Sequence, residues 1–522
     1  MFSAQVHKHF YYGALLLFAA SLPFSIFTLS VAHVTLIVNW ILEGKFKKKL
    51  ELAKKSPSLW VFTLFYLVHI LWMMHSPDIS TAMHELSIKL PMLMLPIIIS
   101  TSESISENKL RGILNVYLVS VLSGTMISAY TIFGLDGKVF HTIADYSRYV
   151  YHIQWSIMVV IAIFIVFHQF GATRKNYKWL YIPLFFWFVC YIFMLQALTG
   201  IVIFIITSII LLFRIIFKYD HLMLRWFSLV SILTIILLIG SYLSNSYASF
   251  HSFDTINTAS LEKYTASGAL YTHDVKSKLV ENGHYVNLYV CESELEKSWN
   301  KRSKLRYDGL TYNGEQLKRT LSRYLTSKGV RKDSVGMSGL SNHEISFIEL
   351  GKTNYIDTLK FSLRPRIYVT WWELYNYSNG GNPSGYSVVQ RLEALKTAFH
   401  IIGKTTWFGV GTGAVVASFV KQYEADNSSL SRNNRIRTHN QFVTYIISFG
   451  IIGFLLISFS LIVPALIEKK YSNYLLLVIL LIMMLSFLDD DTLELIFGIS
   501  LFAFFYSLFL FSAHPAKDDF HE

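Results

Sequence analysis

Long apolar runs separated by short polar connections dominate the chain. A membrane-spanning helix needs about 20 mostly apolar residues to cross a hydrocarbon core of about 30 Å. About twelve apolar segments are candidates, several of them shorter than this length, at 10–27, 29–42, 59–74, 85–100, 111–134, 149–168, 178–195, 197–217, 226–244, 440–466, 473–488 and 492–512. We therefore predict an all-α polytopic membrane protein with about twelve transmembrane helices.

One long polar interval separates the ninth and tenth predicted spans. Residues 245–439 have the composition of a soluble domain and hold most of the remaining charge. The predicted organisation is membrane helices 1–9 over 1–244, a loop domain over 245–439, and helices 10–12 with a tail over 440–522. Inside the loop, the β-branched and aromatic run 284–291 predicts a strand, and the charged stretch 292–328 predicts helix, which indicates a small α(+β) fold.

Composition indicates the class of protein, and the distribution of charge indicates the orientation of the spans. A mean hydropathy of +0.42, with 53% hydrophobic and 15% charged residues, excludes an ordinary soluble chain. Lys and Arg concentrate in the short connections that a cytoplasmic N-terminus places inside, which predicts cytoplasmic termini and a large loop on the outer side. Because the net charge of +12 largely reflects this signal, nucleic acid is not an expected partner, whereas the lipid bilayer is.

A helix is expected to begin at Ser387 and to lie on the membrane surface. Ser387 and Gln390 have the spacing of a capping box. Apolar residues then recur at helical spacing, namely Val388, Leu392, Leu395, Phe399 and Ile402. Arg391 falls in the first turns, where the helix dipole favours anions and a guanidinium can bind phosphate oxygens two at a time. The alternative is a solvated arginine on the polar side of the helix.

His439 stands where a basic outer segment enters the tenth predicted span. A neutral imidazole there can take a proton from a hydroxyl near neutral pH, since its ordinary pKa is about 6.5. The alternative is an interfacial histidine bonded to backbone. Arg437 precedes it, and Lys89 and Arg148 are further basic residues on the outer side. Charges at membrane depth usually face a polar cavity, although Lys89 could also snorkel outward. Together with Arg391, these residues could line one site for an anionic group such as a pyrophosphate.

Two other motifs have simpler interpretations. The run Gly409-Val-Gly411-Thr-Gly413 lacks the strand, spacing and acidic partner of a dinucleotide-binding loop, so a close-packed turn is expected. The acidic run 489–491 with Glu494 could bind a divalent cation, but an acidic outer turn is the commoner explanation. No group of His and Cys has the spacing of a zinc site, so no metal site is predicted.

The resemblance to a known family rests on several stretches of the chain. The O-antigen ligase family of bacterial membrane glycosyltransferases is similar at Ser387 to Lys396, Gly409 to Gly413, His439-Asn440-Gln441-Phe442, Gly450-Ile-Ile-Gly453, Leu488 to Glu494 and Phe502 to Phe505. Its members resemble twelve-span proteins with a large periplasmic loop between spans nine and ten. The similarity is specific over about 387–505, and the insert 284–354 resembles a feature of the family's Bacteroidetes branch.

This resemblance implies an inverting, metal-independent transfer without a cofactor. A polysaccharide would move from undecaprenyl pyrophosphate to a hydroxyl of an acceptor such as lipid A-core, at the periplasmic face of the bacterial inner membrane. Arg391 matches the arginine that holds the pyrophosphate, and His439 matches the histidine at the acceptor. The family usually has a further arginine before the eighth span, where this chain has Leu198; Arg148 and Lys89 are the candidates to replace it.

Two other functions stay open. A polysaccharide polymerase of the same fold uses the same donor with a growing lipid-linked chain as acceptor; the short connection 135–148 favours the ligase, because polymerases often have two sizeable outer loops. A transporter or sensor with a ligand-binding outer domain belongs to another class. Against it, the chain has no obvious inverted repeats.

Overall fold

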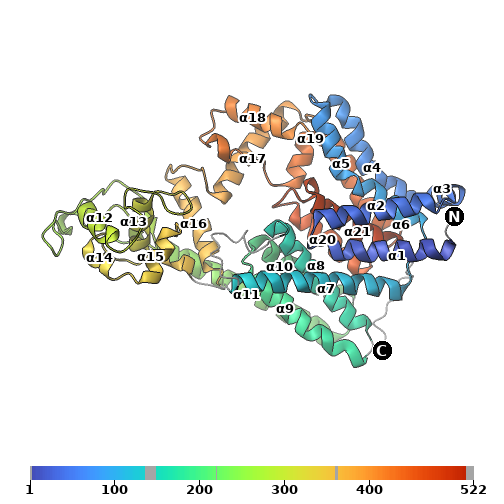
Figure 1. Cartoon of the computed structure of the whole chain (residues 1–522), viewed down its shortest axis with the longest axis horizontal. Helices are drawn as coiled ribbons and strands as arrows, with labels where there is room; N and C mark the ends of the chain where they lie inside the picture. Colours follow the sequence, from blue (N-terminus) through green and yellow to red (C-terminus); the bar gives the residue numbers. More distant parts are fainter. Residues whose placement is uncertain are drawn as a thin grey trace. The chain divides into compact units, whose positions relative to one another are not determined.

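The computed structural model describes residues 3–133, 135, 149–173, 175–218, 220–358 and 362–512. Over these residues the chain is mostly helical (Figure 1). Its described strands are β1 (Val280–Glu281) and β2 (His284–Tyr285), which pair antiparallel. The predicted helical class is therefore confirmed.

The chain divides into two compact units, one comprising Met1–Ile210 and Gln390–Glu522 and the other Leu211–Val389. The helices, in chain order, are α1 (Ala4–Ser21), α2 (Ile26–Leu42), α3 (Phe46–Lys54), α4 (Pro57–Trp72), η1 (Met73–His75), α5 (Ile79–Lys89), α6 (Pro91–Thr101), α7 (Glu107–Ile132), α8 (His152–Ala172), η3 (Lys175–Leu180), α9 (Tyr181–Met194), α10 (Leu198–Lys218), α11 (Leu222–Phe250), η4 (Thr258–Ser260), α12 (Glu292–Asn300), α13 (Leu317–Ser327), α14 (Ser334–Ser338), α15 (Asn342–Glu349), η5 (Tyr355–Thr358), α16 (Arg364–Ser378), α17 (Ser387–Lys404), α18 (Val415–Ala425), η6 (Arg432–Asn434), α19 (Gln441–Ile467), α20 (Tyr474–Ser486), η7 (Thr492–Glu494) and α21 (Ile496–Phe511).

Every predicted membrane span falls on one or more of these helices. Among the described residues, 8 helices are long and apolar enough to cross a membrane. The pair Ile26–Leu42 and Phe46–Lys54 passes the same test but is bent by 109°, and α20 and α21 are shorter apolar helices. The chain is therefore a membrane protein with multiple apolar helices, and the number of twelve crossings stays a prediction.

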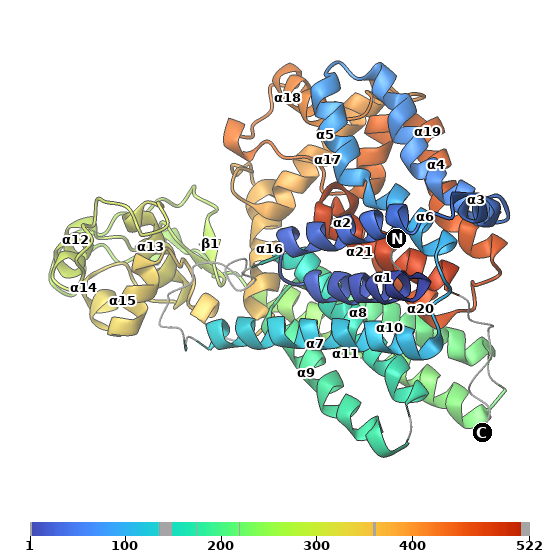
Figure 2. The ribbon, with the colours of Figure 1, turned by 45° about the vertical axis from the view of Figure 1, so that its right-hand side comes forward.

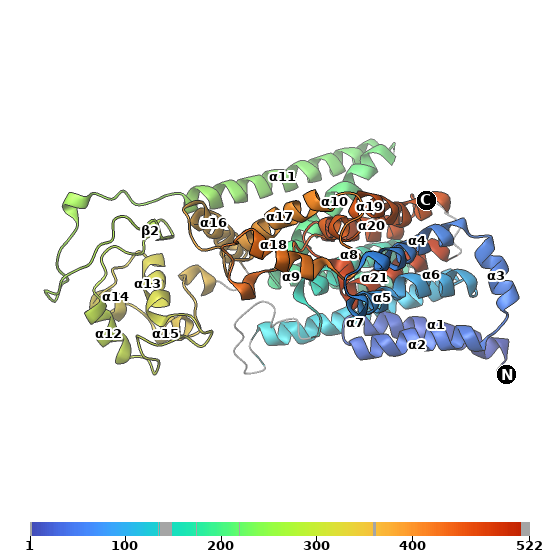
Figure 3. The ribbon, with the colours of Figure 1, turned by 90° about the horizontal axis from the view of Figure 1, so that it is seen from above.

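The first unit is built around buried apolar helices. The helix α21 is buried along nearly its whole length and packs on α6, while α4 packs along α19. On one side α1 packs between α2 and α7 (Figure 2), and Figure 3 shows α1 and α2 side by side from above. In an apolar environment helices associate mainly through van der Waals packing, so these closely packed pairs hold the framework that positions the polar residues.

A break in α19 gives the unit its most irregular backbone. Gly450 has φ 64° and ψ −173°, which no helix allows. The segment between α17 and α18 pairs with the broken region: the Gly411 amide donates to the Ser448 carbonyl (2.9 Å), and the Ile451 amide donates to the Thr406 carbonyl (2.9 Å). Backbone groups freed by the break are thereby satisfied inside the protein, as an apolar environment requires.

The three glycines of the 409–413 run are needed for this close approach. Gly409, Gly411 and Gly413 have φ of 67°, 98° and 79°, where a side chain is strained. A Cβ on Gly411 would also lie 2.8 Å from the backbone of His75, and one on Gly413 would lie 2.9 Å from the backbone of Ala82. The expected close-packed turn is confirmed, and it brings α17 and α18 beside α5 and α19 (Figure 2).

The helix α17 begins at Ser387 as predicted, but a different face is packed. The side chains against α18 and α19 are the small Ala394 and Ala398, both fully buried, and Ile401. Leu392 and Phe399, which the apolar pattern marks, are 39% and 60% exposed. Small residues allow the neighbouring helices to approach closely, and the larger apolar side chains are left on the outer surface.

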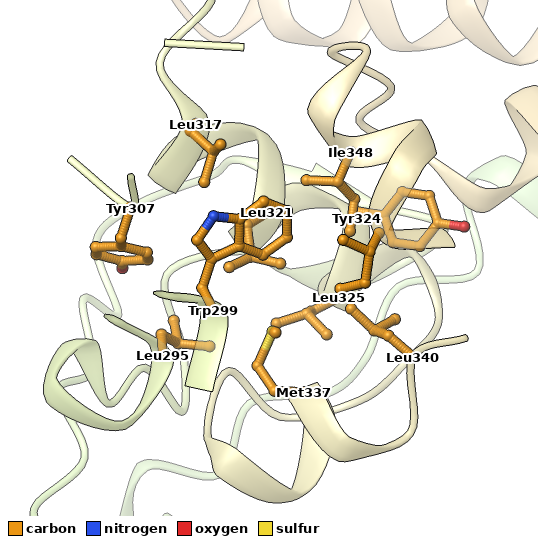
Figure 4. Packing of buried hydrophobic residues seen from close by; sticks show 11 residues of the cluster. Leu295, Trp299, Tyr307, Leu317, Leu321, Tyr324, Leu325, Met337, Leu340 and Ile348 are labelled. Atoms are coloured by element: carbon orange, nitrogen blue, oxygen red, sulfur yellow. The ribbon is translucent and has the colours of Figure 1, made fainter. Parts of the chain in front are cut away.

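The second unit has its own core under α12 to α15. Trp299, fully buried, packs with Leu295, Leu321, Tyr324 and other apolar side chains (Figure 4). Its indole N–H donates to the Leu305 carbonyl (2.8 Å), so the polar atom of the ring is satisfied as well. A separate cluster joins the end of α11 to α16.

The predicted strand over 284–291 is largely wrong. Only His284–Tyr285 forms a strand, and Val290 makes isolated bridges to Thr272 and Lys332. β-branched and aromatic residues favour a strand only where a partner of matching length exists, and here turns surround the segment. The predicted helix over 292–328 is interrupted between α12 and α13.

Candidate active site

The acidic turn, defined as Asp489 to Asp491 with Glu494, lies between α20 and α21. Each of its four carboxylates faces one of the basic side chains that the sequence marked. The pairs are Arg391 with Asp489, His439 with Asp490, Arg437 with Asp491 and Lys89 with Glu494. Side chains that are far apart in the sequence therefore meet at one turn, all within the first unit.

Arg391 lies in the second turn of α17. Its Nη1 pairs with one carboxylate oxygen of Asp489, and the hydroxyl of Thr199, at the start of α10, donates to the other. A guanidinium has five N–H donors in a planar fork, so a contact through Nη1 leaves most of the fork for a second anion. The carboxylate fixes the arginine without exhausting its donors.

His439 connects the loop to α19 and is held by strong local constraints. Its φ of 50° is left-handed, which is uncommon for a residue other than glycine. The next residue, Asn440, accepts the Val443 amide (3.1 Å) to cap α19 and donates to the Leu488 carbonyl (3.0 Å). These bonds tie the histidine to the acidic turn, and its Nδ1 lies 3.7 Å from Oδ1 of Asp490, which is 3% exposed.

Arg437 approaches the most buried part of the turn. Its Nε lies 3.8 Å from Oδ2 of Asp491, and the Thr444 hydroxyl donates to the other oxygen (2.7 Å). Burial raises the pKa of Asp491, whereas Arg437 and the Thr444 hydroxyl act in the opposite direction. The negative charge of Asp491 therefore depends on the arginine beside it.

Lys89, at the end of α5, lies between two carboxylates. Its Nζ is 2.5 Å from Glu494 and 2.7 Å from Glu85, and the Gln441 side-chain amide donates to the other oxygen of Glu494 (2.9 Å). The two carboxylates offset the free-energy cost of burying the ammonium group. An isolated buried charge would lack this compensation.

Exposure divides the four basic residues into two kinds. The side chains of Arg391, Arg437 and His439 are 29%, 29% and 32% exposed, whereas that of Lys89 is 1% exposed. Three of them can therefore touch a ligand directly, and Lys89 reaches the site through Glu494.

The remaining expectations concern Arg148 and Leu198. Arg148 and the connection 136–148 lie outside the described residues. Leu198 begins α10, and the neighbouring Thr199 supplies the hydroxyl that bonds Asp489. Leu198 thus supplies no charge where the resemblance implies an arginine, and the neutral hydroxyl of the next residue, Thr199, contacts Asp489.

The acidic turn itself was set aside in the sequence as an acidic outer turn. One signal could have revealed its role: several basic residues placed at one side of a membrane need counter-charges, and this run is the densest acidic segment near a predicted span. Among the described residues, no group of three or more His, Cys, Asp or Glu could hold a metal ion.

Comparison with known protein families gives a match within the segment that carries most of these residues. Residues 367–458 match the family model described as O-Antigen ligase. The matched segment contains Arg391, Arg437 and His439, together with the glycine run and the first part of α19. No curated protein matches the chain.

Proposed function

Because residues 367–458 match the family model described as O-Antigen ligase, we propose that this chain acts as a member of that family and transfers a polysaccharide from undecaprenyl pyrophosphate to an acceptor hydroxyl, such as one on lipid A-core. The family supports the broader class, an O-antigen ligase or polymerase-type membrane glycosyltransferase acting on glycans at a bilayer. In the proposal, the large loop is periplasmic and the reaction takes place at the outer face of the bacterial inner membrane.

The observation that carries this proposal is the convergence of Arg391, Arg437 and His439 on one acidic turn, each with an exposed part. Arg391 uses Nη1 and Arg437 uses Nε toward a carboxylate, so both have N–H donors left for a diphosphate. Lys89 acts as a positioning residue through Glu494, since its own ammonium is enclosed.

In the proposed step, the acceptor hydroxyl attacks the anomeric carbon of the donor sugar. The bond from that carbon to the pyrophosphate oxygen breaks, and its electron pair stays on the pyrophosphate. Arg391 and Arg437 stabilise the growing negative charge, which is the electrostatic contribution that fixed cations make best. Attack opposite the leaving group inverts the configuration of the anomeric carbon. The proposed step needs no metal ion and consumes no nucleotide.

The proton of the acceptor passes to His439. Because its Nδ1 faces Asp490, Nε2 is the nitrogen available to the hydroxyl. The Asp490 carboxylate then stabilises the imidazolium that forms, and the constrained left-handed backbone holds the ring in place.

A chromosomal deletion with plasmid complementation tests the function. Loss of ligated glycan with accumulation of full-length lipid-linked polymer is expected. Single repeat units on the carrier or on lipid A-core would instead indicate a polymerase, and unchanged surface glycan would refute a transferase and favour a transporter or sensor.

The site is tested by complementing with Arg391→Ala and His439→Ala. Both should abolish transfer at normal protein level in the membrane. Matched controls are Arg432→Ala and His343→Ala, two exposed residues, which should complement fully. A double variant of Arg391 and His439 that still transfers glycan would remove this assignment.

A further inference from the structure

The second unit contains a cleft of about 510 Å³, separate from the acidic turn. Its walls come from the end of α11, the β1–β2 turn, the end of α13 and the start of α16. All of these belong to residues 211–389, so the cleft is complete within one unit. Its volume falls within the range that small-ligand sites occupy.

One wall is a polar stripe near the C-terminal end of α11. Tyr242, Asn245, Ser246 and Ser249 occur at positions i, i+3, i+4 and i+7 of α11, and all four line the cleft. This spacing places them on a single face. In the described part of the chain, the side chains of Asn245, Ser246 and Ser249 have no hydrogen-bond partner, so their donors and acceptors are available to a ligand.

The opposite wall is rigid. The Tyr368 hydroxyl accepts the Asn282 amide (2.8 Å) and donates to Glu281 (2.9 Å). Glu281, fully buried, is neutralised by Arg323 at 2.6 Å and bonded by Asn354 at 2.9 Å. Because this network is satisfied, the cleft wall presents fixed groups, and the buried carboxylate adds no net negative charge.

Among its described residues, the lining of the cleft has one cationic side chain without an acidic partner, Arg364. None of the described residues that line it is acidic, whereas Lys328, His284 and Arg364 are basic or titratable. Lys328 pairs with Glu344 (2.6 Å), and His284 lies 2.7 Å from Asp254. Arg364 begins α16 and is exposed, and across the described ranges its guanidinium has no ion pair or hydrogen bond. The uncompensated cation and the start of a helix both favour an anion.

We propose that this cleft binds a short anionic oligosaccharide, whose hydroxyls bond the α11 stripe and whose carboxylate or phosphate contacts Arg364. Tyrosine rings beside polar side chains suit the alternating apolar and hydroxylated surfaces of sugars. The inference rests on the proposed function, for which it names the substrate class: an acidic glycan held by the insert beside the end of an apolar helix.

Binding to purified full-length protein in detergent tests the proposal directly. The probes are digalacturonate, which carries carboxylates, maltose 1-phosphate, which carries a phosphate, and neutral maltose. At least one anionic probe should bind at least tenfold more tightly than maltose, and the stronger of the two identifies the anion. Arg364→Gln should weaken that binding at least fivefold, and Asn245→Ala should weaken it for the same sugar.

Two matched variants separate this inference from the transferase assignment. Arg319→Gln, an exposed arginine of α13 outside the cleft, should bind like wild type. His439→Ala should lose transfer and keep probe binding. Failure of both anionic probes to bind, equal binding of maltose, or equal behaviour of Arg364→Gln and Arg319→Gln would overturn the cleft proposal whatever the transfer assay shows.

Discussion

Replacing Arg391 tests whether its guanidinium only forms a structural ion pair with Asp489 or also acts as a cation in the transfer step. Arg391 and Asp489 are 29% and 39% exposed, and such pairs contribute only about 0–1 kcal/mol to stability. Loss of a cation that stabilises the leaving pyrophosphate should instead cost a factor of about 10² to 10³ in rate, or about 3–4 kcal/mol of barrier. Arg391→Gln should therefore leave the unfolding midpoint nearly unchanged and remove almost all transfer.

The charge-swapped double variant Arg391→Asp with Asp489→Arg sharpens this test. It keeps an ion pair between the same positions but moves the guanidinium onto the acidic turn. Transfer is measured in membranes as ligated glycan per amount of protein, and stability is measured by tryptophan fluorescence on heating in detergent. The swap should stay inactive. Recovery to within tenfold of wild type, or a large loss of stability in Arg391→Gln, would show that the arginine is only structural.

Three further predictions concern stability. Lys89→Met should lower it by about 3–5 kcal/mol because it leaves the nearly buried Glu494 carboxylate without its cation, and adding Glu494→Gln should recover part of the loss; a double variant no more stable than the single one would contradict this. Burial lowers the pKa of Lys332 from 10.5 to about 8, so the folded state binds fewer protons between pH 8 and 10.5 and stability should rise with pH in that window. Lys332→Met should remove that slope and stabilise the protein at pH 7 by up to about 3 kcal/mol, as melting curves across pH can check. Gly450→Ala should prevent folding, because its φ of 64° is strained for alanine and the new Cβ would overlap the backbone of a neighbouring segment, whereas Gly240→Ala, with open space around it, should be tolerated in the same expression and gel-filtration assay.

The sequence alone determined the properties that depend on neighbouring residues. Apolar runs of sufficient length predict helices, and a helix lies on every predicted span. The start of α17 at Ser387 and the close-packed glycine turn at 409–413 could also be predicted. Helix periodicity and the conformational freedom of glycine depend only on residues that are close together in the sequence. The four basic residues that meet at the acidic turn were also marked in the sequence, since a charge near a membrane span is costly and therefore conspicuous; their roles in a site stay a prediction.

Only the tertiary structure decided which charges meet. Arg391 and Asp489 are 98 positions apart and Lys89 and Glu494 are 405 apart, and no periodic pattern links such positions. The packed face of α17 also depends on the tertiary structure, because the small residues lie where neighbouring helices approach closely. The same is true of the predicted strand at 284–291, since only a two-residue strand is available to pair with it. Local preferences are set by a residue and its neighbours along the chain, whereas ion pairs and packed faces depend on distances that exist only after the chain has folded.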